Sequence, residues 1–207
     1  MDYIHHLKEV LHGEENLKLV KKEAQEYYRN HGTEDCLLTG IRLYLSDSYQ
    51  IQEVGVFILG HLSAGCPEAL DFLRYTISEN ANWKVQETLA MAFDIFCCDT
   101  GYEEALPIIR DWMKDENSNV RRAVSEGLRI WTSRPYFREH PEEAIALLSS
   151  NRNDTSEYCR KSIGNALKDI SKKFPELIHK ELSSWQLLSK EEKQVYKIAS
   201  KFLPQDM

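Results

Sequence analysis

The chain has 207 residues, of which 42% are hydrophobic and 29% are charged, the balance of a folded protein and not of a disordered one. A net charge of −7 argues against indiscriminate binding to nucleic acid, and no run of about 18 apolar residues is present that could span a membrane. The N-terminal segment MDYIHHLKEV is charged and amphipathic, which does not suit a secretory leader. The 5 cysteines show no metal-binding spacing, so we expect reduced thiols, no metal site and a cytoplasmic location.

The negative charge is concentrated in the first part of the chain. Residues 1–120 carry 10 Lys and Arg against 21 Asp and Glu, whereas residues 121–207 carry 16 against 12. A polyanionic ligand is therefore expected on the C-terminal part. The alternative is that this charge difference is ordinary variation between solvated helix faces and has no functional meaning.

Apolar residues recur at spacings of three and four along the chain, and no run shows the alternation of a β-strand. Only 9 Gly and 6 Pro are present, which favours long helices joined by short turns. Pro67 and Pro141 suit the first turn of a helix, and Gly13, Gly32 and Gly101 suit helix ends. In chain order, the pattern predicts helices over residues 3–11, 14–30, 34–46, 49–63, 67–79, 83–97, 101–114, 118–132, 141–150, 155–173, 175–185 and 189–202.

Four segments repeat one pattern: YQIQEVGVFILGHLS, NWKVQETLAMAFDIF, SNVRRAVSEGLRIW and EYCRKSIGNALKDIS. In each, an apolar residue precedes two polar positions, and a second apolar residue follows eight positions after the first. The pattern begins at Ile51, Val85, Val120 and Cys159, at intervals of 34, 35 and 39 residues. Such a period is typical of two-helix HEAT-like units. We therefore expect an all-α fold, a right-handed superhelical solenoid of about five or six HEAT-like helical hairpins, forming a single domain over residues 1–207.

The second helices of consecutive hairpins usually line the concave surface of a solenoid. When the four segments are aligned, polar side chains fall in register on this face, namely Glu87, Arg122, Glu126, Lys161, Asn165 and Asp169. These groups could pair with each other or receive a ligand. Arg122 and Glu126 are also spaced as an ordinary surface ion pair worth about 0.3–0.5 kcal/mol. No phosphate-binding glycine loop, HExxH motif or Ser-His-Asp grouping is present, so we expect no cofactor.

Two segments, NVRRAVSEGLRIW and SEYCRKSIGNALKDISKKFP, resemble the AlkC/AlkD family of HEAT-like DNA alkylation repair glycosylases. The resemblance extends from about residue 50 to about residue 205, and the two motifs occur in the same order on successive repeats. It implies excision of cationic N3- or N7-alkylated purines from duplex DNA. A cationic base is already a good leaving group, so the protein must chiefly hold the DNA backbone and stabilise the oxocarbenium-like sugar. A carboxylate can do this and can also orient water.

The resemblance assigns a role to each residue of the expected site. The catalytic carboxylates would be Glu87, Glu126 and Asp169. The residues that contact substrate or DNA would be Trp83, Arg121, Arg122, Trp131, Arg160, Lys161, Asn165 and Lys168. Tryptophan in such repeats is more often part of the hairpin core than a platform for a base.

The chain departs from the family pattern at particular points. Asn165 stands where the AlkD branch carries an aromatic residue. Glu87, four residues after Trp83, stands where that branch has Asp. The acidic net charge is also unusual among these glycosylases. The alternative is therefore a non-catalytic HEAT-repeat module whose groove binds a protein partner or altered DNA.

Overall fold

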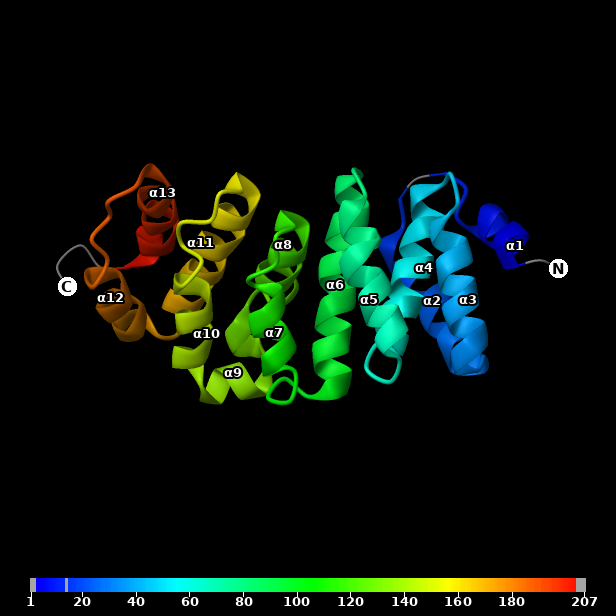
Figure 1. Ribbon diagram of the computed structural model, residues 1–207, viewed down its shortest axis with the longest axis horizontal. Helices are drawn as coiled ribbons and strands as arrows, with labels where there is room; N and C mark the ends of the chain where they lie inside the picture. Colours follow the sequence, from blue (N-terminus) through cyan, green and yellow to red (C-terminus); the bar gives the residue numbers. More distant parts are fainter. Residues whose placement is uncertain (1–2, 14, 204–207) are drawn as a thin grey trace. The chain divides into compact units, whose positions relative to one another are not determined.

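The computed structural model describes residues 3–13 and 15–203 (Figure 1). Within these ranges the chain forms 13 α-helices and three short 3₁₀ helices and no β-strand, which confirms the all-α prediction. None of the helices in these ranges is both long and apolar enough to cross a membrane. Contacts between Cα atoms divide the chain into two compact units, residues 1–100 and 101–207. A single domain and a right-handed superhelix stay predictions.

The first unit is built around one buried helix, α4. Its helices are α1 (Tyr3–Val10), α2 (Leu17–Asn30), α3 (Thr33–Tyr44), α4 (Tyr49–Leu62), α5 (Pro67–Tyr75), η1 (Ile77–Glu79) and α6 (Trp83–Thr100). Helix α4 packs against α2, α3 and α6, and 11 of its 14 residues are buried. A Cβ on Gly55 would lie 2.5 Å from the carbonyl oxygen of Gly40, so these glycines allow α3 and α4 to pack closely.

The second unit is built around α11. Its helices are α7 (Leu106–Trp112), α8 (Ser118–Gly127), η2 (Trp131–Ser133), α9 (Pro135–Glu139), α10 (Pro141–Ser149), α11 (Glu157–Ser171), α12 (Pro175–Ser183), α13 (Lys190–Ala199) and η3 (Ser200–Phe202). Helix α11 packs against α8, α10, α12 and α13. A hydrophobic stripe on α11, including Ile163, Leu167 and Ile170, is buried, as the helical period predicts.

Many predicted helix boundaries differ from the structure by a few residues, and three differences change how the chain is organised. Helix α8 ends at Gly127, not at residue 132, and the chain turns at Ile130 with a φ of 54°. Helix α7 begins at Leu106, not at residue 101, because Gly101 adopts a φ of 97°, which a helix does not allow. Helix α9 lies between the predicted helices over residues 118–132 and 141–150, where no helix was predicted, and it has Pro135 at its first position. The predicted start of the second helix at residue 14 lies outside the described residues.

Four helices, α4, α6, α8 and α11, begin in the same way, with a turn closed by one hydrogen bond that we call a corner. In each, a long polar side chain in the first turn of the helix reaches back and donates a hydrogen bond to the backbone carbonyl of the residue six positions earlier. The donor and acceptor pairs are Gln52 to Ser46 at 2.7 Å, Gln86 to Asn80 at 2.8 Å, Arg121 to Asp115 at 2.7 Å and Arg160 to Asp154 at 2.7 Å. Each bond satisfies a turn carbonyl that helix formation leaves without a partner.

Candidate nucleic-acid interface and its carboxylates

Two of the predicted carboxylates, Glu126 and Asp169, are held by one arginine. Arg129 lies just beyond the end of α8, with its Nη1 3.2 Å from Glu126 Oε1 and its Nε 3.3 Å from Asp169 Oδ2. Glu126 comes from α8 and Asp169 from α11, so the guanidinium joins successive inner helices. The structure therefore brings these two predicted residues together.

The second oxygen of each carboxylate also has a partner. The Ser162 hydroxyl donates to Glu126 Oε2 at 2.8 Å, and Lys172 Nζ lies 2.7 Å from Asp169 Oδ1. Burial alone would raise the pKa of Asp169, but hydrogen bonds and charge from Lys172 and Arg129 outweigh burial and lower this pKa below its usual value. Asp169 is therefore ionised at neutral pH.

Arg129 was not among the residues expected from the sequence. The predicted helix over residues 118–132 would have placed its side chain on a regular helix face. Helix α8 instead ends at Gly127, and the Arg129 guanidinium contacts both carboxylates from just beyond this end. The sequence signal was the glycine in SEGLRIW, which marks a helix end as readily as a helix interior.

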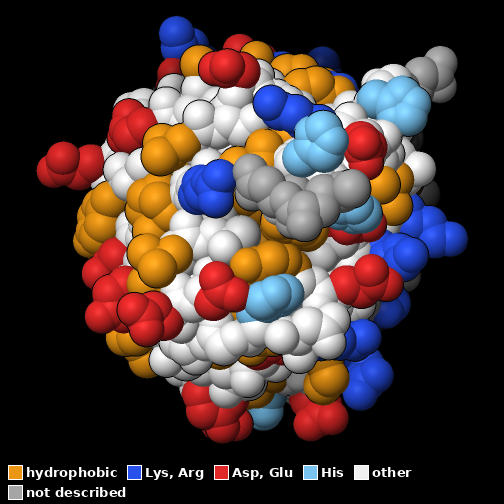
Figure 2. Space-filling model, turned by 90° about the vertical axis from the view of Figure 1, so that its right-hand side faces the viewer, with side chains coloured by type: hydrophobic (Ala, Val, Ile, Leu, Met, Phe, Trp, Pro, Cys, Tyr) orange, Lys and Arg blue, Asp and Glu red, His pale blue; other side chains and the backbone are white. Residues whose placement is uncertain are grey.

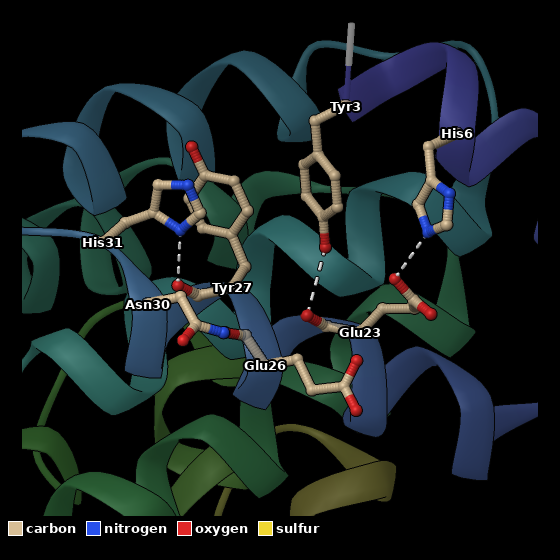
Figure 3. A pocket seen from close by; sticks show the side chains of 7 residues that line it. All are labelled: Tyr3, His6, Glu23, Glu26, Tyr27, Asn30 and His31. Atoms are coloured by element: carbon tan, nitrogen blue, oxygen red, sulfur yellow. Dashed lines mark hydrogen bonds and ion pairs between the residues drawn. The ribbon is translucent and has the colours of Figure 1, made fainter. Parts of the chain in front are cut away.

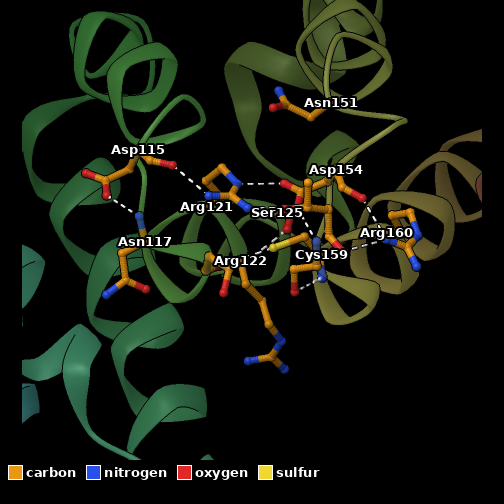
Figure 4. Close-up of polar contacts among 12 residues, drawn as sticks. Asp115, Asn117, Arg121, Arg122, Ser125, Asn151, Asp154, Cys159 and Arg160 are labelled. Atoms are coloured by element: carbon orange, nitrogen blue, oxygen red, sulfur yellow. Dashed lines mark hydrogen bonds and ion pairs between the residues drawn. The ribbon is translucent and has the colours of Figure 1, made fainter. Parts of the chain in front are cut away.

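Arg121 and Arg160 hold the corners of the second unit (Figure 4). Arg121 Nε and Nη2 donate to the two carboxylate oxygens of Asp154 at 2.6 and 2.8 Å, and the Arg121 side chain is only 13% exposed. Burial would raise the pKa of Asp154, but hydrogen bonds from Arg121 and from the Ser156 backbone lower it. Arg160 Nε donates to Gln194 Oε1 at 2.7 Å. These contacts give both arginines a structural role where a phosphate contact was expected.

Three other expected cations lie on α8 and α11 and make none of these corner contacts. Figure 4 shows the Arg122 side chain directed away from the Arg121–Asp154 pair. Lys161 is exposed, with its Nζ 2.7 Å from Glu157 Oε1, and Lys168 Nζ donates to Asn165 Oδ1 at 2.6 Å. We call Arg122, Lys161 and Lys168 the α8–α11 cations.

Trp131 is enclosed by the second unit. Its ring is 0% exposed and lies edge-on to Phe137 with 4.8 Å between ring centroids. A fully enclosed ring cannot present a face to a base. The structure therefore places Trp131 in the core, in line with the usual position of tryptophan in helical hairpins.

Trp83 and Glu87 lie on α6, in the first unit. Trp83 is 68% exposed at the first position of the helix, and Lys84 Nζ lies 5.7 Å from the centroid of its ring. Glu87 is half-buried on the same helix. The convergence of Glu87 with Glu126 and Asp169, which belong to the other unit, stays a prediction.

Glu53 is a buried carboxyl group in the same register as Glu87, one repeat earlier. Its side chain lies on α4 and the residue is 2% exposed, with the Thr88 hydroxyl donating to Oε1 at 3.1 Å. Its other oxygen, Oε2, is buried without a hydrogen-bond partner among the described residues. Burial raises the pKa of Glu53 to about 7. The repeat pattern aligns Glu53 with Glu87, since each follows the start of its repeat by two residues, but it does not show that Glu53 is buried.

The first unit also has a hollow of about 430 Å³ beside α1 and α2 (Figure 3). Its walls are aromatic, acidic and amide side chains, namely Tyr3, His6, Glu23, Glu26, Tyr27, Asn30 and His31. Figure 2 looks onto this side of the unit and shows histidine, acidic and apolar side chains mixed over it. No Lys or Arg lines the hollow, so it is poorly suited to a phosphate group.

Helical hairpins with repeated corners, and a face of paired acids and bases on α8 and α11, define a HEAT-like repeat protein with a charged surface on these two helices. The model of the DNA alkylation repair enzyme family matches residues 14–194. The chain therefore belongs to the DNA alkylation repair enzyme family.

Three relatives show how far the similarity extends. The crystal structure of AlkD2 from Streptococcus mutans is 48% identical, with 97% of each chain covered and a TM-score of 0.94. The alkylpurine DNA glycosylase AlkC from Pseudomonas fluorescens, solved bound to DNA containing an abasic site analog, shares the fold at 21% identity and a TM-score of 0.61, covering 87% of this chain and 51% of that one. The uncharacterized protein YhaZ of Bacillus subtilis is 36% identical over 87 residues, which cover 40% of this chain and 24% of that relative.

Proposed function

We propose that this chain is a cytoplasmic DNA glycosylase that binds duplex DNA along α8 and α11 and excises cationic N3- or N7-alkylated purines. The observation that carries the proposal is the shared contact of Glu126 and Asp169 with Arg129. Two carboxylates from successive repeats are thereby fixed in one place, close to the α8–α11 cations that would bind phosphates. Membership of the repair family and the structural likeness to a DNA-bound glycosylase support this assignment.

The chemistry requires negative charge near the sugar of the damaged nucleotide. Asp169 supplies it, because its lowered pKa keeps it ionised, and a positively charged alkylpurine needs no proton from the protein to leave. Arg129 and Lys172 neutralise the carboxylates in the absence of DNA. A phosphate that binds either cation would free a carboxylate oxygen for the oxocarbenium-like sugar or for a water molecule.

The cations divide into two groups by their contacts. Arg121 and Arg160 fix the corners from which α8 and α11 begin, so they orient the interface. The α8–α11 cations would contact the DNA backbone, and each phosphate contact adds salt-dependent affinity without reading the base sequence.

Release of N3-methyladenine and N7-methylguanine from methylated duplex DNA tests the proposal. We expect release by wild type and a loss on the order of 10²-fold in the rate for Asp169→Asn and for Glu126→Gln, since each removes a charge directed at the transition state. Glu176→Gln is the matched control, because Glu176 is an exposed acid of the same unit and should change nothing. Equal release by all four proteins would overturn the roles of Glu126 and Asp169.

A second candidate function is binding of altered DNA without excision. It is favoured by one observation: both oxygens of Glu126 and of Asp169 already have protein partners, and Arg129 and Lys172 balance the two negative charges. Salt-sensitive binding of methylated duplex by wild type, with no base released, would select this candidate over the glycosylase.

A further inference from the structure

The hollow beside α1 and α2 combines carboxylate groups with aromatic rings (Figure 3). Most of its lining comes from the C-terminal part of α2 and the residue that follows this helix, namely Glu23, Glu26, Tyr27, Asn30 and His31. Their spacings of three and four residues place these side chains on one face of α2. The C-terminal end of a helix carries partial negative charge, so this face favours a positively charged group.

Four aromatic rings form a row along the hollow, in the order His6, Tyr3, Tyr27 and His31 (Figure 3). The centroids of successive rings are 6.0, 4.5 and 3.8 Å apart, and their planes differ by 15°, 30° and 6°. The Tyr3 hydroxyl donates a hydrogen bond to the backbone carbonyl of Glu23 at 3.1 Å, which joins α1 to α2. The row is therefore held in place without a ligand.

Glu23 is a buried acid beside the widest gap in this row. The residue is 9% exposed, and His6 Nε2 lies 3.0 Å from its Oε2. A neutral imidazole at this place donates one hydrogen bond and leaves the carboxylate its negative charge. Among the described residues, Glu23 Oε1 has no hydrogen-bond partner, so a ligand N–H group would satisfy an oxygen that the protein leaves without a donor.

The charges around the hollow are mainly negative. Glu26 adds a second carboxylate one helical turn from Glu23, and its partner Lys22 lies 3.6 Å away in an exposed pair. Burial raises the pKa of the Tyr3 hydroxyl above its usual range, and the negative charge of Glu23 raises this pKa further. Surroundings that disfavour another negative charge favour a positive one.

We infer that this hollow binds a small organic ammonium ion, whose charged head donates to Glu23 Oε1 and whose alkyl chain lies along the aromatic row. Aromatic rings attract cations, and no Lys or Arg lines the hollow to repel one. A metal ion fits less well, because no three His, Cys, Asp or Glu side chains are grouped as ligands in the described part of the chain. The inference does not depend on the proposed function, which concerns α8 and α11.

Two substitutions test the two parts of this site. Glu23→Gln removes the negative charge and nearly preserves the shape, whereas Tyr27→Leu removes a ring from the row and keeps an apolar side chain. Glu9→Gln is the matched control for the charge, because Glu9 is an exposed acid of α1 that does not line the hollow.

The measurement is a titration of each protein with butylammonium, followed by the amide NMR spectrum at about pH 8 and low ionic strength. Butanol is the neutral counterpart of nearly the same shape. We expect wild type and Glu9→Gln to saturate with butylammonium at millimolar concentration, with shifts confined to α1 and α2, and to show no saturation with butanol. Glu23→Gln should weaken binding about tenfold or more, and Tyr27→Leu about threefold.

Equal responses of wild type to butylammonium and butanol would overturn the inference, as would unchanged affinity in Glu23→Gln. The comparison of the two ligands needs only wild type, so it decides the question even where Glu23→Gln does not fold. Shifts that saturate elsewhere in the chain would also contradict a site in this hollow.

Discussion

At the scale of single residues, burial decides what a carboxyl group can do. Asp169 is half-buried beside two cations and stays ionised, whereas Glu53 is buried beside one hydroxyl donor and has a pKa raised to about 7. Asp169 lies on α11 and Glu53 on α4, the helices around which the two units are built. Their environments therefore keep one ionised at neutral pH and bring the pKa of the other close to neutrality.

Glu53 should make folding stability depend on pH. Because its pKa rises from 4.5 to about 7 on folding, the folded state retains a proton that the unfolded state releases between these values. Stability contributed by the protonated group is full below about pH 4.5 and is lost as the pH rises through 7, a total of about 3 kcal/mol. Urea unfolding of wild type and Glu53→Gln at pH 5 and pH 8 measures this difference.

Glu53→Gln should remove most of that dependence, because the amide cannot ionise. Glu34→Gln, which alters an exposed acid of α3, should leave the pH dependence of wild type unchanged. If Glu53→Gln loses as much stability as wild type between pH 5 and pH 8, another group is responsible for the effect.

At the scale of helices, adjacent arginines at the start of α8 have different tasks. Arg121 closes the corner and pairs with Asp154, whose side chain is 3% exposed, while Arg122 points away from that pair. Removal of one partner from a buried ion pair leaves the other charge uncompensated. Such a loss typically costs about 3–5 kcal/mol.

We therefore expect substitutions of these two neighbouring residues to affect different properties, the stability of the fold in one case and DNA binding in the other. Arg121→Gln should lower the free energy of unfolding by about 3 kcal/mol. Arg122→Gln should change it by less than about 1 kcal/mol but weaken DNA binding equally for all sequences. Chemical denaturation and DNA titration of both variants provide the comparison, and a large loss of stability in Arg122→Gln would mean that it is a structural residue.

The packing of α11 against α13 depends on a residue without a side chain. A Cβ at Gly164 would lie 2.8 Å from Ile198 Cβ, closer than packed carbon atoms approach each other. Gly164→Ala should therefore destabilise the second unit by about 1–3 kcal/mol. Gly65→Ala is the control, since no atom lies within 4 Å of its added Cβ, and an equal loss of melting temperature in both variants would contradict this explanation.

Helical periodicity predicted the existence of most of these helices, because each buries one apolar stripe. It could not place the end of α8, since Gly127 is compatible with a helix interior and the spacing of apolar residues does not reveal the positive φ of Ile130. For the same reason the site was predicted only in part. Glu126 and Asp169 were found from the repeat register, while Arg129 required the observed turn.

At the scale of the whole molecule, the distribution of charge explains how an acidic chain could bind DNA. Residues 121–207 carry 16 Lys and Arg against 12 Asp and Glu, although the whole chain has a net charge of −7. The α8–α11 cations fall in this basic part. DNA binding would therefore use a local positive surface and would be weak elsewhere on the protein.

The salt dependence of duplex DNA affinity tests this claim most directly. Wild type should bind at low salt with a slope of log affinity against log salt of about −3, since three phosphate contacts each release about one counterion. A triple variant that replaces the α8–α11 cations with glutamine should bring the slope close to zero. The matched control replaces three exposed cations of α2, namely Lys18, Lys22 and Arg29.

We predict that the α2 control keeps the slope of wild type, while the α8–α11 variant loses both the slope and most of the affinity. Equal slopes for both triple variants, or no binding by wild type even at low salt, would contradict the assignment of α8 and α11 as the DNA-binding surface.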